Sequence, residues 1–240
     1  MPGRSGSAPW PAAWPEPQET HPAPAAVLLA AGAGWVSWNH LAGNQRTSPD
    51  PALQLAIAFT EQRPFEYRIP GAAPASLRQE RGGSSSFQRP QALRDAISTI
   101  GAELAKNPEA VKWMELRARA EMLEREPQAA IDTLNHALEQ KPDDPDLWAD
   151  LGMAYALRAG DSNHTADYSQ AIDLLNRSLQ RKPNSPEVAF NLALVYEKMN
   201  ANDLAIEEWK HYLKLDPAGA WGVEAQDHLA KLEQKKKSGK

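Results

Sequence analysis

The sequence of 240 residues contains no cysteine, and only 7% of its residues are aromatic. The absence of cysteine excludes disulfide bonds, thiolate metal ligands and a cysteine nucleophile. The net charge of −5 leaves no basic excess of the kind that neutralises phosphates in a nucleic-acid-binding surface. We therefore expect no nucleic-acid partner.

Motifs for catalysis and metal binding are also missing from the sequence. No glycine-rich phosphate loop, nucleophile elbow or zinc-protease motif occurs. The histidines show no spacing typical of metal ligands; they are His21, His40, His136, His164, His211 and His228. We expect a protein that is not an enzyme and that binds no cofactor and no metal ion. An enzyme of unfamiliar type is the alternative that the sequence leaves open.

A short skeleton occurs four times: Ala-Ile, a leucine seven residues later, and a proline four residues after that. The prolines lie 34, 41 and 34 residues apart, at Pro108, Pro142, Pro183 and Pro217. Two short helices cannot bury an apolar face alone, so a period of this length indicates stacked helix pairs. Within the second copy, Ala130, Leu134 and Leu138 form the stripe of an amphipathic helix. The repeat predicts an all-α solenoid of antiparallel helix pairs.

Residues upstream of each skeleton carry the resemblance to a known family. The best match is Trp148, Leu151, Gly152 and Tyr155, followed by Ala171, Leu175 and Pro183. A second match is Ala189, Leu192, Ala193, Tyr196, Ala205, Trp209 and Pro217, and a weaker one is Met114, Ala118, Ala130, Leu134, Ala137 and Pro142. This pattern resembles the tetratricopeptide repeat family. The resemblance implies a right-handed superhelical solenoid over residues 90–234.

The resemblance also sets the expected organisation of that region. We expect a half-repeat cap at 90–110, repeats at 111–144, 145–185 and 186–219, a capping helix at 220–234 and a basic tail at 235–240. The capping helix would bury Trp221, Val223, Ala225, Leu229 and Leu232 on one side. The tail either is solvated or contacts an anionic surface.

The middle repeat is seven residues longer than its neighbours, with the excess between Tyr155 and Ala171. We expect this insertion, residues 158–168, to lengthen the turn between two helices. Its polar residues alternate as in a calcium loop, but the glycine and the glutamate of such a loop are missing. A polar turn that a partner could touch is the other interpretation.

The N-terminal part of the chain differs in composition from the repeats. Residues 1–24 contain seven prolines and are predicted to be disordered. Residues 25–45 carry no Asp, Glu, Lys or Arg, and Trp35 and Trp38 would suit a membrane interface. A membrane anchor, a soluble alanine-rich helix and a cleaved signal are the alternatives. The protein is accordingly either membrane-anchored through this helix or cytoplasmic.

Residues 46–89 are predicted to be a linker with a short helix, 52–60, and an extended segment, 65–69. The run 59–71, followed by the repeats, resembles bacterial proteins that carry a membrane helix, a linker, tetratricopeptide repeats and a caspase-like peptidase domain of the CHAT type. That resemblance implies a bacterial protein and favours the anchor. No peptidase activity is implied, because the chain ends before such a domain and has no cysteine.

The family resemblance implies that the first helices of the repeats line a groove for another protein. The groove positions are Lys112, Glu115, Leu116, Arg119, Leu123, Asp146, Ala149, Asp150, Met153, Leu157, Glu187, Phe190, Asn191, Leu194 and Lys198. Phe190 and Arg119 are the strongest candidates because their residue types dominate binding hot spots. Met153 and Leu194 either contribute to the groove floor or pack between repeats. Asp150 stands where the carboxylate clamp of chaperone adaptors needs an asparagine, so that clamp is not expected.

These expectations lead to two main hypotheses. The first is a non-catalytic scaffold or adaptor, membrane-tethered or not, that binds a peptide or helical segment of a partner. The second is a recognition subunit or remnant of a larger bacterial signalling or peptidase system that combines tetratricopeptide repeats (TPR) with a CHAT-type domain, which we call a TPR/CHAT-type system. A third alternative is end-to-end stacking into a homo-oligomer, and the sequence does not give the oligomeric state.

Overall fold

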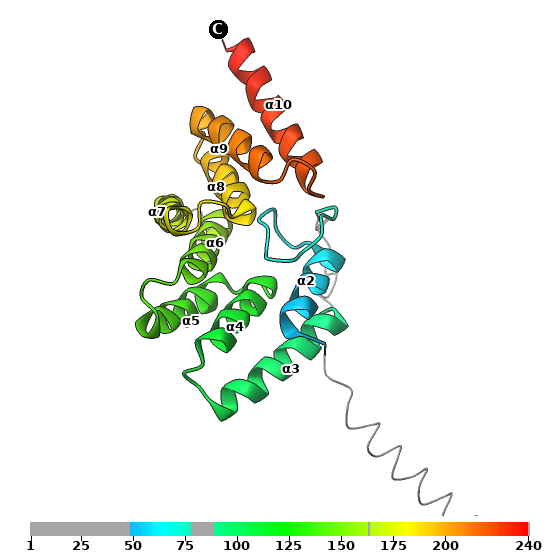
Figure 1. Cartoon of the computed structure of the whole chain (residues 1–240), viewed down its shortest axis with the longest axis vertical. Helices are drawn as coiled ribbons and strands as arrows, with labels where there is room; N and C mark the ends of the chain where they lie inside the picture. Colours follow the sequence, from blue (N-terminus) through cyan, green and yellow to red (C-terminus); the bar gives the residue numbers. More distant parts are fainter. Residues whose placement is uncertain (1–48, 78–88, 163, 240) are drawn as a thin grey trace, which may run out of the picture. The chain divides into compact units, whose positions relative to one another are not determined.

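The computed structural model describes residues 49–77, 89–162 and 164–239 (Figure 1). These residues form nine α-helices and no strand, which confirms the all-α prediction. The helices are α2 (Pro51–Gln62), α3 (Gln91–Lys106), α4 (Val111–Leu123), α5 (Pro127–Gln140), α6 (Pro145–Ser162), α7 (Thr165–Arg181), α8 (Pro186–Lys198), α9 (Asn202–Leu215) and α10 (Gly222–Ser238). The expectations for residues 1–24 and 25–45 lie outside the described residues.

Successive helices pack as antiparallel neighbours, and the pairs stack in chain order. Helices α4, α6 and α8 also contact one another in series, and α2 contacts α4. The first helix of each pair therefore contributes to one continuous surface, which we call the inner face. The second helices, α5, α7 and α9, form the opposite layer, as Figure 1 shows.

Close approach between the helices of a pair depends on one glycine. A Cβ atom at Gly152 on α6 would lie 3.0 Å from Leu175 Cγ and 3.2 Å from the carbonyl oxygen of Ala171, both on α7. Few real Cβ contacts are that short, so a larger residue would push the two helices apart. The small residue at this position is thus required by packing.

The half-repeat cap has a helical partner that the sequence pattern did not indicate. Helix α3 carries the second half of the skeleton, and α2 packs along it. In α2, Leu55 and Phe59 are buried, and Asp50 caps its N-terminus by accepting a hydrogen bond from the main chain of Ala52. The cap is therefore a complete helix pair whose two helices are separated by residues 63–90.

The insertion in the middle repeat lengthens helices instead of a turn. Helix α6 has 18 residues and α7 has 17, whereas α4 has 13 and α5 has 14. Arg158 on α6 donates two hydrogen bonds to Asp167 on α7, at 2.7 and 2.8 Å, and this contact lowers the pKa of Asp167. Asp167, one of the polar residues that alternate as in a calcium loop, is thus engaged by an arginine. Asn163, another residue of that pattern, lies outside the described residues.

Helix α10 covers the last repeat. Trp221, Ala225 and Leu232 are buried, as expected, but Val223 is 74% exposed and faces away from the repeat. Within the described part of the chain, no helix combines the length and apolar character needed to cross a bilayer.

Candidate functional site

Residues 63–76, which follow α2, fold against the inner face, and we call them the groove loop. The segment 65–69 contains bends and no strand. Hydrogen bonds close the base of the loop: the main chain of Ala73 donates to Thr60 Oγ1 at 3.2 Å, and Arg63 Nη1 donates to the carbonyl oxygen of Ala75 at 2.5 Å. The loop is therefore a compact insertion between the two helices of the first pair.

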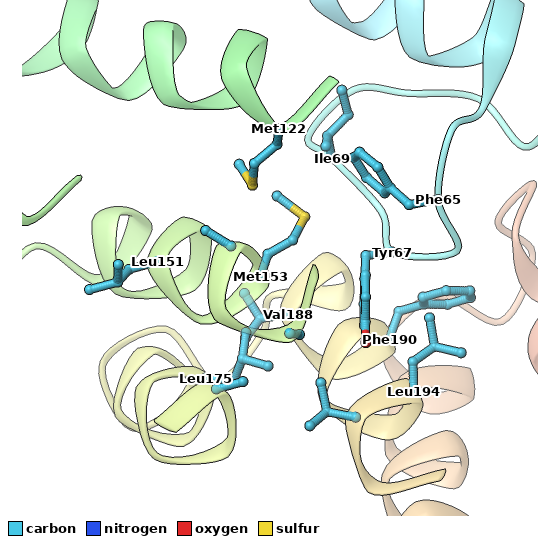
Figure 2. Close-up of a cluster of buried hydrophobic side chains, with 14 of the residues drawn as sticks. Phe65, Tyr67, Ile69, Met122, Leu151, Met153, Leu175, Val188, Phe190 and Leu194 are labelled. Carbon is cyan, nitrogen blue, oxygen red and sulfur yellow. The ribbon is translucent and has the colours of Figure 1, made fainter. Parts of the chain in front are cut away.

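The groove loop buries three large side chains in the core of the repeats. Phe65, Tyr67 and Ile69 are 8%, 5% and 1% exposed. Figure 2 shows them pointing from the loop toward side chains of α4, α6 and α8, including Met122, Met153 and Phe190. Burial also raises the pKa of the Tyr67 hydroxyl. Each such side chain stabilises the folded state by about 1.5–3 kcal/mol, so the loop is an energetically important part of the structure.

Asn191 on α8 holds the main chain of the loop at its tip. Its Oδ1 accepts a hydrogen bond from the main-chain N–H of Arg68 at 2.7 Å, and its Nδ2 donates to the carbonyl oxygen of Arg68 at 2.9 Å. The Asn191 side chain is only 5% exposed, so all of these polar groups are removed from water. Unpaired, each would cost about 1–3 kcal/mol.

The side chain of Arg68 occupies a box of aromatic rings and carboxylates, which we call the arginine box. The guanidinium carbon lies 5.4 Å from the ring centre of Phe190, 5.5 Å from that of Tyr212 and 5.1 Å from that of Trp221. The carboxylates of Glu187 and Asp216 lie 3.5 and 3.9 Å from its terminal nitrogens. Such a box suits a planar cation that both stacks on rings and pairs with carboxylates.

The tyrosine of the box links the guanidinium to one of the carboxylates. Burial raises the pKa of Tyr212 to about 12, and the hydroxyl accepts a hydrogen bond from Arg68 at 3.2 Å while donating to Asp216 at 3.0 Å. Arg68 Nε, by contrast, has no hydrogen-bond acceptor among the described residues. The box therefore satisfies its arginine only in part.

Further contacts tie the groove loop to both ends of the solenoid. Arg63 forms an ion pair with Glu224 on α10 and stacks 4.6 Å from the ring centre of Trp221. Trp221 Nε1 donates to the carbonyl oxygen of Ala72 at 3.0 Å, and Glu66 pairs with Lys198 on α8. The loop thus connects α2, the inner helices and α10.

A cleft of about 200 Å³ remains open on the inner face beside the loop. Its lining includes Ala149, Asp146 and Asp150 on α6, Arg119 on α4, and Pro70 of the loop. Arg119 donates to Asp150 at 2.8 Å and also to Glu115.

Two carboxylates thus share one guanidinium beside the cleft. Burial raises the pKa of Asp150 to about 7, although Arg119 acts in the opposite direction, and burial also raises the pKa of Glu115. Asp150 and Glu115 therefore take up a proton at a higher pH than exposed carboxylates do.

The comparisons with known proteins agree with this architecture. A family model of the tetratricopeptide repeat matches residues 91–145 and 165–220. These residues are tetratricopeptide repeats. The stretch between the two matches contains α6, the first helix of the lengthened middle repeat. No curated protein matches the sequence.

Two solved structures show the same fold. TTC0263, a thermophilic TPR protein in Thermus thermophilus, is 18% identical with a TM-score of 0.52, over 60% of this chain and 74% of that one. A chain of the APC/C hetero-tetramer Cut9-Hcn1 is 24% identical with a TM-score of 0.51, over 59% of this chain and 27% of that one. At these identities the similarity establishes the tetratricopeptide solenoid and nothing about a partner.

The groove residues predicted for the tetratricopeptide repeats fall into three groups. Those in contact with the groove loop or packed beneath it are Met153, Phe190, Asn191, Leu194 and Lys198. Those beside the open cleft are Glu115, Arg119, Asp146, Ala149, Asp150 and Glu187. Leu116 and Leu123 are buried in the core, Leu157 is half-buried, and Lys112 is exposed over the ring of Trp113. Contact of these residues with a partner stays a prediction.

The strongest sequence candidates are engaged within the chain itself. Phe190 is fully buried beneath the loop, and Arg119 is 12% exposed between its two carboxylates. Sequence reasoning missed Tyr67 and Arg68, which lie in the linker. The alternation of Phe65, Tyr67 and Ile69 between prolines was the signal that could have found them, because three large apolar side chains need a surface to cover them.

Proposed function

We propose that the chain is a non-catalytic protein–protein interaction scaffold whose inner face binds an extended segment of a partner protein. The observation that carries this proposal is the paired hydrogen bonding of Asn191 with the main chain of Arg68. Such a contact recognises an extended main chain whatever its side chains, and neighbouring pockets then select the side chains. In this structure the segment held in this way belongs to the chain itself.

The open cleft supports an interaction at the inner face next to the groove loop. Its lining carries three carboxylates, Asp146, Asp150 and Glu187, but only two cations, Arg68 and Arg119. A partner segment that enters this cleft would therefore be expected to present a positively charged or amide-rich flank.

A second candidate is a recognition subunit of a TPR/CHAT-type system. The residues that carry that resemblance, 59–71, form the end of α2 and most of the groove loop, so they belong to the folded unit. A CHAT-type peptidase gene beside this one would support this candidate, and its absence from the neighbourhood in several genomes would count against it.

A membrane tether through residues 25–45 is a separate part of the proposal. Fractionation of the native host would test it, with the full chain expected in the membrane fraction. A variant lacking residues 25–45 is then expected in the supernatant after high-speed centrifugation. Recovery of both proteins in the supernatant would remove the tether from the proposal.

The scaffold proposal is tested with two alanine-to-arginine variants of the full chain. Ala149→Arg fills the open cleft, and Ala102→Arg places the same side chain on the exposed surface of α3. Each protein is cross-linked in native host extract, and the captured proteins are identified by mass spectrometry. A partner lost with Ala149→Arg and kept with Ala102→Arg supports the inner face. Equal capture by all three proteins contradicts it, provided that circular dichroism shows the variants folded.

A further inference from the structure

The groove loop shows which side chains the inner face is built to hold. We propose that the partner segment carries an arginine between an aromatic and an aliphatic residue, and that the groove loop occupies the same place as an internal competitor. This inference rests on the proposed function, because it names the chemistry of the partner at the same surface. The three residues correspond to Tyr67, Arg68 and Ile69 of the loop.

The arginine box selects arginine over lysine. Three rings lie within 5.5 Å of the guanidinium carbon, and two carboxylates lie at its edge. A guanidinium is planar and weakly hydrated, so it can stack on rings and pair with carboxylates at once. A lysine ammonium is a compact, strongly hydrated charge and uses only part of this site.

The positions on either side of the arginine select apolar side chains. Asn191 fixes the main chain of Arg68, so the side chains before and after it enter defined places. Tyr67 and Ile69 are 5% and 1% exposed there, and Figure 2 shows both pointing toward the buried side chains of the inner helices. An acidic residue before the aromatic one would pair with Lys198, as Glu66 does.

The fit of the loop leaves room for a better ligand. The ion pairs of Arg68 with Glu187 and Asp216 are long, at 3.5 and 3.9 Å, and Arg68 Nε has no acceptor among the described residues. The loop is tied down at its base by Thr60 and Arg63, which restricts how its tip can settle. A segment free of these ties can adjust to the box. The loop nevertheless has the advantage of being attached, which gives it a high effective concentration.

Competition of this kind predicts how affinity changes when the loop is released. The affinity measured for a ligand falls in proportion to the fraction of molecules whose site is open. The full chain with Tyr67→Ser and Arg68→Glu, which we call the released variant, should have an open site. Its tyrosine anchor is removed, and the new carboxylate at position 68 faces Glu187 and Asp216. A milder variant, Arg68→Gln, keeps the tyrosine anchor and should open the site in part.

The experiment measures binding of a fluorescent synthetic peptide with the sequence of residues 62–76, capped at both ends, by anisotropy. The released variant is expected to bind it at least tenfold more tightly than the wild type, with Arg68→Gln between the two. The same peptide with lysine only at the position of Arg68, and with the arginine of position 63 kept, should bind at least tenfold more weakly to the released variant. Adding Asn191→Ala to the released variant should weaken binding similarly.

A second measurement uses the wild type alone, so the proposal does not depend on how well the released variant folds. Hydrogen exchange of the Arg68 amide, which donates to Asn191, is followed as excess peptide is added. Faster exchange at that amide is expected, because the peptide displaces the loop. Binding that leaves the exchange unchanged would overturn the proposal, since the peptide would then lie elsewhere.

Other outcomes also decide the matter. A folded released variant that ignores the peptide, or that binds the arginine and lysine peptides equally, overturns the proposed chemistry. A stable wild-type dimer in light scattering whose loops exchange between copies would assign the site to a second copy of the chain. Loss of the cross-linked partner with Ala149→Arg would leave the scaffold function standing in each of these cases, so the two proposals fail separately.

Discussion

The carboxamide of Asn191 binds both main-chain groups of Arg68, a residue 123 positions earlier in the chain. A single side chain on α8 thereby fixes the tip of a loop that starts at the other end of the solenoid. Because the groove loop covers this part of the inner face, Asn191 and the main chain of Arg68 are buried in the folded protein. The same pair of hydrogen bonds is the contact by which the inner face can hold the main chain of a segment.

Replacing Asn191 by alanine is expected to destabilise the protein by about 2–4 kcal/mol, because the N–H and C=O groups of Arg68 would lose their partners in a buried place. Urea unfolding measures the change, and the Arg68 amide should exchange faster. The matched control is Asn176→Ala on α7, whose hydrogen bond to Tyr196 is long at 3.4 Å and should cost less than about 1 kcal/mol. Equal effects at the two positions would mean that the contact with Arg68 contributes little.

Two glycine-to-alanine changes are expected to have opposite signs. At Gly152 the added methyl group meets Leu175 and the main chain of Ala171, so Gly152→Ala should destabilise the protein by about 1–3 kcal/mol. At Gly101 on α3 nothing lies within 4 Å of the added methyl group, so Gly101→Ala should stabilise it by about 0.5–1 kcal/mol through helix propensity. Thermal unfolding of both variants checks the prediction. A stabilising change at Gly152 would show that α6 and α7 are not as close as the structure places them.

The repeats could be predicted from the sequence because their information is local and periodic. Positions such as Gly152 and Ala171 recur at fixed spacing, and each has a packing reason that requires no knowledge of distant residues. The same logic located Asn191 and Phe190 on the inner face. The prediction of a longer turn at the insertion was wrong, because a helix can absorb extra residues at its ends as readily as a turn can. The composition of residues 158–168 does not distinguish the two outcomes.

The groove loop could not be predicted from the same pattern. Its contacts join residues more than 100 positions apart, such as Arg63 with Glu224 and Arg68 with Glu187, and no periodicity encodes such pairs. Helix α2 was recognised as a short helix, but its role as the partner of α3 depends on a connection of unusual length. Sequence reasoning therefore described the scaffold well and missed what fills its inner face.

Replacing Trp221, at the start of α10, is expected to cost more stability than replacing the half-buried Trp113. It is 2% exposed, lies against Phe59 and Phe190, and donates to Ala72, so it joins α10 to the groove loop. Trp221→Ala should cost about 3–5 kcal/mol, whereas Trp221→Phe, which loses mainly the donor, should cost about 1–2 kcal/mol. Chemical unfolding gives both values. The control is Trp113→Ala on α4, a half-buried position where a smaller loss is expected, and a larger loss there would contradict the ranking.

The buried carboxylates around Arg119 should make stability depend on pH. Burial raises the pKa of Asp150 from its usual value of about 4 to about 7, so the folded protein binds this proton more tightly than the unfolded chain does. The stabilisation is present in full below a pH of about 4 and is lost as the pH rises through about 7. Across that window the loss of stability amounts to about 4 kcal/mol, because each pKa unit corresponds to about 1.4 kcal/mol.

The variant Asp150→Asn isolates this contribution, because its amide cannot titrate. Urea unfolding of both proteins from pH 4 to pH 8 should show the wild type losing stability relative to Asp150→Asn as the pH rises, while other titrating groups cancel in the difference. Glu115, whose pKa is also raised by burial, shares the same guanidinium, so Glu115→Gln should shift the transition of Asp150 to lower pH by removing the competing charge. A difference between the two proteins that stays constant over this range would mean that Arg119 holds Asp150 ionised throughout, in which case the ion pair outweighs the desolvation of the carboxylate.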